Sequence, residues 1–156
     1  MENRKEVFDT LLRNIENVID GTVSTDEALL TICHLLKDAV PHYDWVGFYL
    51  VDPEKGRELV LGPFVGEQTE HVWIPFGKGI CGRAAEEEET LIVQDVSKET
   101  NYFSCSTDVK SEIVVPIFKD DRIAGELDID SHTVSAFTYD DRRFLEKVCE
   151  QVSEVL

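Results

Sequence analysis

Residues 111–130, SEIVVPIFKDDRIAGELDID, contain the pattern that decides the fold of this chain. Two mainly apolar runs, Glu112–Phe118 and Ile123–Asp130, are joined by the short polar stretch Lys119–Arg122. Apolar runs of this length with a polar turn between them are typical of a β-hairpin. We therefore expect two neighbouring antiparallel strands at this point of the chain.

The acidic residues of this hairpin are expected to lie on one face. Side chains alternate along a strand, so Asp128 and Asp130 share a face, about 7 Å apart. Leu127 and Ile129 take the opposite face. Asp is disfavoured in strands, and Glu112 in the neighbouring strand is placed to approach the pair across the sheet. Two interpretations remain open: a polar sheet face in an acidic protein, or a buried site that contains three carboxylates.

The rest of the chain predicts helices towards both ends and further strands between them. Apolar residues recur at helical spacing over residues 4–20, from Ser24 to Pro41, and from about Thr138 onwards. A short helix is expected from Ile80 to about Glu88. This order predicts an α+β fold with a mainly antiparallel sheet, and one domain over residues 1–156. In addition to the hairpin, strand-like runs occur at Trp45–Val51, Arg57–Leu61, His71–Ile74 and Leu91–Gln94.

Composition limits the classes of function. The 156 residues include 32 Asp and Glu against 15 Lys and Arg, which gives a formal net charge of −17. Such a negative field repels nucleic acid and anionic membrane surfaces, so we expect neither as a partner. No apolar run approaches the roughly 20 residues of a membrane span, and no secretory signal is visible. A cytoplasmic location is therefore expected, where thiols are kept reduced.

The 4 cysteines fall into three kinds of environment. Cys33 and Cys149 lie on apolar helical stripes and are expected to be buried as small hydrophobic residues. Cys81 begins the short helix, where backbone N–H groups, the helix dipole and nearby Lys78 favour a thiolate. Cys105 lies in a polar stretch typical of a loop, where a cysteine is either incidental or reactive. Together with the acidic residues, Cys81 and Cys105 indicate thiol redox chemistry on a small polar substrate.

Residues 77–82, Gly-Lys-Gly-Ile-Cys-Gly, match the G-x-G-x-x-G pattern of dinucleotide-binding folds. That chemistry requires alternating β and α units with a parallel sheet, which the element order does not offer. A tight turn into the short helix is the interpretation that we favour. The histidines show no ligand spacing, so we expect no metal and no cofactor; they are His34, His42, His71 and His132.

Two aromatic residues share one face of the first expected strand. Trp45 and Tyr49 would be about 13 Å apart on a straight strand, with Gly47 between them. They either flank a small ligand or pack in the core. The sequence leaves both interpretations open.

In combination, these motifs resemble the free methionine-(R)-sulfoxide reductases, which are single GAF-domain enzymes. The resemblance implies a GAF-like (PAS-related) domain, with a central antiparallel sheet, N- and C-terminal helices on one side and a pocket on the other. It implies reduction of free methionine sulfoxide to methionine, with recycling by thioredoxin or a similar dithiol, in a monomer or homodimer. It covers about residues 25–156 and rests on Trp45–Leu50, Leu61–Phe64, Ile74–Pro75, Gly77–Gly82, Ser111–Pro116 and Leu127–Ser131.

The resemblance also implies roles for individual residues. Cys105 matches the family's nucleophile, which becomes a sulfenic acid, and Cys81 matches a resolving cysteine that forms a disulfide with it. The remaining matches belong to the substrate pocket: the acidic residues Glu112, Asp128 and Asp130, and the aromatic residues Trp45 and Tyr49. The alternative is a non-catalytic GAF domain that binds a small ligand or senses oxidants through Cys105.

Two positions depart from the family pattern. His71 stands where many members carry a further cysteine, which leaves Cys81 as the candidate resolving residue. Glu126 occupies a position that is often apolar in the family. We expect the Glu126 side chain to face solvent at the far end of its strand.

Overall fold

The computed structural model of this chain describes residues 3–21, 24–99 and 108–156. Its centre is a six-stranded sheet in the order β3-β2-β1-β6-β5-β4, and every neighbouring pair is antiparallel. The expected α+β class and antiparallel sheet are therefore confirmed. The strands are β1 (Trp45–Val51), β2 (Glu58–Val65), β3 (Trp73–Pro75), β4 (Leu91–Val93), β5 (Ser111–Lys119) and β6 (Arg122–Ser131).

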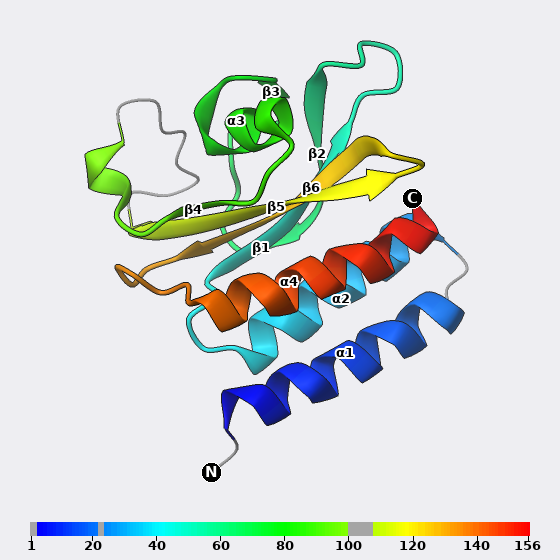
Figure 1. Ribbon diagram of the computed structural model, residues 1–156, viewed down its shortest axis with the longest axis vertical. Coiled ribbons are helices and arrows are strands. Elements are labelled where there is room, and N and C mark those ends of the chain that lie inside the picture. Colours follow the sequence, from blue (N-terminus) through cyan, green and yellow to red (C-terminus); the bar gives the residue numbers. More distant parts are fainter. Residues whose placement is uncertain (1–2, 22–23, 100–107) are drawn as a thin grey trace.

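The helices lie on both sides of this sheet. On one side, α2 (Thr25–Ala39) and α4 (Tyr139–Val152) pack on the strands, and α1 (Arg4–Gly21) packs on these two helices (Figure 1). On the other side, α3 (Gly79–Glu87) lies over β5 and β6. None of these helices is long and apolar enough to cross a lipid bilayer.

The strand alternation read from the sequence divides the sheet into two faces. Val46 and Phe48 of β1 and Leu127 of β6 belong to the core beneath α1, α2 and α4. Trp45 and Tyr49 point to the other face, where they join a second apolar cluster beneath α3. Both faces of the sheet are therefore covered, and acidic residues on the α3 side are removed from water.

Strand β2 continues further than the sequence indicates. The pattern predicted an end at Leu61, because Gly and Pro follow it. Instead, β2 runs to Val65, and its last residues pair with β1 through Gly47↔Phe64 and Val46↔Val65. A register shift between Gly47 and Tyr49 accompanies this extension.

Residues 77–82 form the tight turn that we favoured over a dinucleotide site. Gly77 and Gly79 have φ angles of 88° and 63°, in the left-handed region that glycine adopts without strain. A Cβ atom at Gly82 would lie 2.5 Å from the carbonyl oxygen of Pro75, so only glycine fits where α3 passes this turn. The first turn of α3, with Cys81, is thereby held close to the sheet.

The start of α4 is fixed by a buried acidic residue. Asp141 closes a capping box with Thr138, whose backbone N–H and hydroxyl donate to Asp141 Oδ2 at 2.9 and 2.7 Å. Tyr43 donates its hydroxyl to Asp141 Oδ1 at 2.7 Å, and His42 Nε2 lies 3.2 Å from the same oxygen. Arg4 of α1 reaches Oδ2 at 3.1 Å. One carboxylate thus joins three parts of the fold.

Candidate active site

The β5–β6 hairpin places three carboxyl groups on the face covered by α3. Glu112 stands directly opposite Asp130, and Asp128 follows one step further along the same face. Only 3% of Glu112, 2% of Asp128 and 1% of Asp130 is exposed. These acids therefore belong to a buried cluster, which excludes the interpretation of a solvated polar sheet face.

Cys81 lies against this cluster from above. Its thiol donates a hydrogen bond from Sγ to Asp128 Oδ2 at 3.3 Å. Sγ and one oxygen each from Glu112 and Asp128 all lie within 4.8 Å of one another. The helix and the hairpin, which are far apart in the sequence, thus bring one thiol and two carboxyl groups into contact.

The prediction that helix α3 favours a Cys81 thiolate is wrong. Cys81 does occupy the first turn of α3, but burial raises the pKa of its thiol well above the ordinary value. The neighbouring carboxyl groups of Asp128, Glu112 and Glu126 raise that pKa further, since any negative charge on them opposes a thiolate. Removal from water and nearby carboxylates outweigh the helix dipole, so Cys81 is a protonated hydrogen-bond donor at neutral pH.

Asp128 is also driven towards its neutral form. Burial raises the pKa of its carboxyl group, while hydrogen bonds with Glu112 and Cys81 act in the opposite direction. Two carboxyl groups share a hydrogen bond only when one of them carries a proton. Glu112 and Asp128 therefore hold a proton between them, which makes this pair a source of acid at neutral pH.

Glu126 does not face solvent, contrary to our expectation. It follows the same alternation as Asp128 and Asp130 and is fully buried, at 0% exposure. Among the described residues, neither of its carboxyl oxygens has a hydrogen-bond partner. Burial, followed by the charge of Asp128, raises the Glu126 pKa well above its ordinary value. Glu126 is therefore a neutral, unsatisfied acid beside the cluster.

Glu126→Met is expected to stabilise the protein, because it replaces a buried unsatisfied carboxyl group with an apolar chain of similar length. The gain should be about 1–3 kcal/mol at neutral pH. The raised pKa keeps Glu126 protonated in the folded protein, whereas the unfolded chain loses this proton above about pH 4.3. Wild-type stability therefore falls as pH rises above that value, and the stability gained by Glu126→Met should grow with pH. Guanidinium unfolding at two pH values measures both effects. Glu126→Gln, which stays polar, should remove the pH dependence without the full gain; equal stability of wild type and Glu126→Met would refute this account.

The buried cluster forms one wall of a small cavity. Its volume is about 10 Å³, roughly the space of one water molecule. Lys78 adds a cationic side chain to the wall. The lining residues are Tyr49, His71, Ile74, Lys78, Gly79, Ile80, Cys81, Glu112 and Asp128.

The two aromatic candidates have different positions. Tyr49 lines the cavity and donates its hydroxyl to the backbone oxygen of His71 at 2.8 Å. The indole of Trp45 covers Gly47, where a Cβ atom would lie 2.4 Å from the ring, and its Nε1 donates to Glu67 at 2.9 Å. Trp45 stands opposite Asp130 in the register, beside the residues that line the cavity.

Cys105, the predicted nucleophile, lies outside the described residues.

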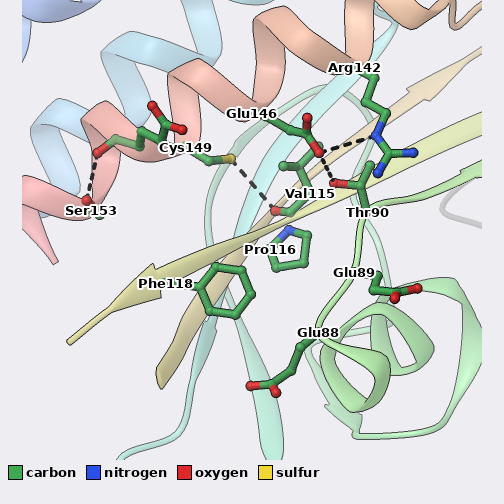
Figure 2. A pocket seen from close by; sticks show the side chains of 11 residues that line it. Glu88, Glu89, Thr90, Val115, Pro116, Phe118, Arg142, Glu146, Cys149 and Ser153 are labelled. Carbon is green, nitrogen blue, oxygen red and sulfur yellow. Dashed lines mark hydrogen bonds and ion pairs between the residues drawn. The ribbon is translucent and has the colours of Figure 1, made fainter. Parts of the chain in front are cut away.

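A larger hollow lies elsewhere, along the outer edge of β5. It has a volume of about 620 Å³ and is lined mainly by residues that follow α3 and residues of β5 and α4 (Figure 2). Cys149 lies at its base and donates to the Val115 carbonyl oxygen at 3.8 Å, and Arg142 is paired with Glu146 at 3.2 Å. No residue that was predicted for chemistry and lies in the described part of the chain lines this groove, so size alone does not identify the site.

The comparisons with known proteins agree with this geometry. Residues 22–156 match the family model of the GAF domain. The chain is 37% identical, over 97% of its length, to the free methionine-R-sulfoxide reductase of Saccharomyces cerevisiae and covers 87% of that protein. The Escherichia coli enzyme of the same name is 33% identical over 99% of this chain and 91% of its own length.

Solved structures give the same result for the fold. The X-ray structure of the free methionine-R-sulfoxide reductase from Neisseria meningitidis, in complex with its substrate, superposes with a TM-score of 0.92. The sequence identity is 35%, and the match covers 99% of this chain and 90% of the other. The expected GAF-like architecture is confirmed, with the N- and C-terminal helices on one side of the sheet and the pocket, beneath α3, on the other.

Proposed function

The chain belongs to the GAF-domain family of free methionine-R-sulfoxide reductases, and from this premise we propose that it reduces free methionine-(R)-sulfoxide to methionine. The observation that carries the proposal is the buried contact of the Cys81 thiol with the Glu112–Asp128 pair. Sulfoxide reduction requires both a thiol that supplies electrons and an acid for the oxygen, and this cluster contains both kinds of group.

In the first step, the thiolate of Cys105 attacks the sulfoxide sulfur while an acid protonates the sulfoxide oxygen. The oxygen passes to the Cys105 sulfur, so methionine is released and Cys105 becomes a sulfenic acid. Glu112, supported by Asp130 across the hairpin, is the acid in this proposal. A carboxyl group donates a proton at neutral pH only when burial or another carboxyl group raises its pKa, and both conditions exist here.

In the second step, Cys81 attacks the sulfenic acid, and a disulfide and water are formed. The thiol must lose its proton as it attacks, and Asp128 already accepts the hydrogen bond from Cys81 Sγ. Thioredoxin or a similar dithiol then reduces the disulfide by exchange. This order explains why a thiol with a raised pKa is useful as the resolving group: it stays protonated until the sulfenic acid is in place.

The free amino acid is recognised by its ammonium group in this proposal. Asp128 Oδ1 is buried and has no hydrogen-bond partner among the described residues, so it is available to accept from the substrate ammonium. Trp45 contacts the substrate methyl group. A methionine within a peptide has no ammonium group at this point, so it loses this contact with Asp128.

The proposal is tested with racemic free methionine sulfoxide and excess dithiothreitol, with the epimers separated by chiral chromatography. We expect conversion of half of the mixture, with the S epimer left over. The N-acetylated sulfoxide, which lacks the ammonium group, should be a poor substrate under the same conditions. No conversion by fully reduced protein would instead favour a GAF domain that binds a ligand without catalysis.

A further inference from the structure

We propose that Cys81, Glu112 and Asp128 bind a zinc ion in the reduced protein, and that this ion blocks the reductase site. The ligand atoms, one sulfur and two oxygens, lie within 4.8 Å of one another. Around a tetrahedral zinc ion, a sulfur and an oxygen ligand are separated by about 3.6 Å. Cys81 Sγ and Asp128 Oδ2 are already 3.3 Å apart, so only small side-chain movements are needed.

The site also contains acceptor capacity that the described chain does not use. Asp128 Oδ1 is buried without a hydrogen-bond partner, and so are both oxygens of Glu126 in the same strand. Buried oxygens are ordinarily satisfied, since each unsatisfied one costs free energy. The two residues are 2% and 0% exposed, so bulk water does not reach these oxygens. A bound cation would satisfy Asp128 directly and stabilise the neighbouring Glu126.

The electrostatic balance of the site favours a divalent cation. Glu112 from β5, together with Asp128, Asp130 and Glu126 from β6, places four buried carboxyl groups on the sheet face beneath α3. Lys78 supplies positive charge on the cavity wall. The negative potential of these carboxyl groups, which keeps the Cys81 thiol protonated, also attracts a metal ion. A thiol that coordinates a metal ion loses its proton.

The mixed ligand set selects zinc over magnesium or calcium. Hard cations prefer oxygen ligands alone, whereas zinc accepts thiolate and carboxylate together. Three protein ligands leave a fourth position for water. On binding, Cys81 releases its thiol proton, and the proton held between Glu112 and Asp128 is also released. These ligands lie far apart in the sequence, so no short spacing reveals them.

Cobalt(II) provides a direct probe, because a cobalt–thiolate bond produces a charge-transfer absorption that carboxylates alone do not. The protein is reduced with a phosphine, since a dithiol would itself bind the metal. We expect the band to appear with the wild type and to disappear when zinc is added. Cys81→Ser should abolish it, and Asp128→Asn should weaken binding by about tenfold or more. Cys149→Ala, which removes a buried thiol beneath the other face, should leave it intact.

Two results would overturn the inference: no band with the wild type, or an undiminished band in Cys81→Ser. Thermal unfolding with and without zinc provides a second measurement, in which zinc should raise the midpoint of the wild type but not of Asp128→Asn.

The proposed inhibition by zinc rests on the proposed reductase function, whereas the proposed binding of zinc does not. Zinc should therefore stop methionine formation, and a chelator should restore it. Turnover without a cobalt band would support the proposed reductase activity and contradict the proposed metal site. A cobalt band without turnover of the sulfoxide would support the metal site and contradict the reductase activity.

Discussion

Cys105→Ser is expected to lower methionine formation by more than about a thousandfold, as the loss of a nucleophile does in other enzymes. A serine hydroxyl remains protonated at neutral pH and does not form a sulfenic acid. Methionine released from free methionine sulfoxide, separated by chromatography, measures the effect. Full turnover by this variant would refute the assignment of the nucleophile.

Cys81→Ser is expected to give a different result in the same assay. Cys105 is the only thiol that the first step needs, so about one methionine per protein should form without reductant. Thioredoxin-dependent turnover should stop because His71, at the position of the family's further cysteine, has no thiol. Dithiothreitol attacks the sulfenic acid directly and should restore part of the rate. Cys33→Ala, which replaces a buried thiol beneath the other face of the sheet, is the matched control.

Asp141→Ala is expected to lower the free energy of unfolding by about 3–5 kcal/mol, the range for breaking a buried charge network. The change removes the Asp141 half of the α4 capping box and leaves the hydroxyl of the buried Tyr43 without its acceptor. Guanidinium denaturation measures the loss. Asp140→Ala alters an exposed acid in the same turn and should cost far less. Similar losses in both variants would contradict the assigned role.

The same variant should change the response to acid. Hydrogen bonds from His42, Thr138 and Tyr43 overcome the effect of burial and hold the pKa of Asp141 well below its ordinary value. A depressed folded-state pKa contributes stability that is present above the unfolded value, about 3.9, and is lost as pH falls further. The difference between wild type and Asp141→Ala should therefore be constant near neutral pH and shrink below about pH 4.

Much of the site followed from the period of the strands. Alternation along the hairpin grouped Asp128 with Asp130, and antiparallel pairing brought Glu112 opposite them. The same rule places Glu126 on that face, but the expectation that it faces solvent relied on its place at the far end of the strand and not on the alternation. The face to which a strand side chain points can be predicted from the strand's own sequence. Whether a helix covers that face depends on the tertiary fold and cannot be predicted in the same way.

Protonation of Cys81 was not predictable from its own segment. Residues near it in the sequence supply a helix dipole and Lys78, and both favour a thiolate. The strongest influence is burial, followed by the carboxyl groups of Asp128, Glu112 and Glu126, which are distant in sequence and approach Cys81 only through the fold. The length of β2 was missed for a related reason, since Gly62 and Pro63 are breakers locally but pairing with β1 continues past them.

The short length of β4 also affects how copies of this protein meet. Among the described strands, none pairs with the outer edge of β5 beyond Val114. Such an edge is a template for aggregation unless it is protected. Pro116 lacks an N–H to donate, and Glu88 and Glu89 flank the groove along this edge (Figure 2). A second copy would bring acids of the same sign to the same place, in a chain of net charge −17. Repulsion and a missing donor thus protect the open edge from self-association.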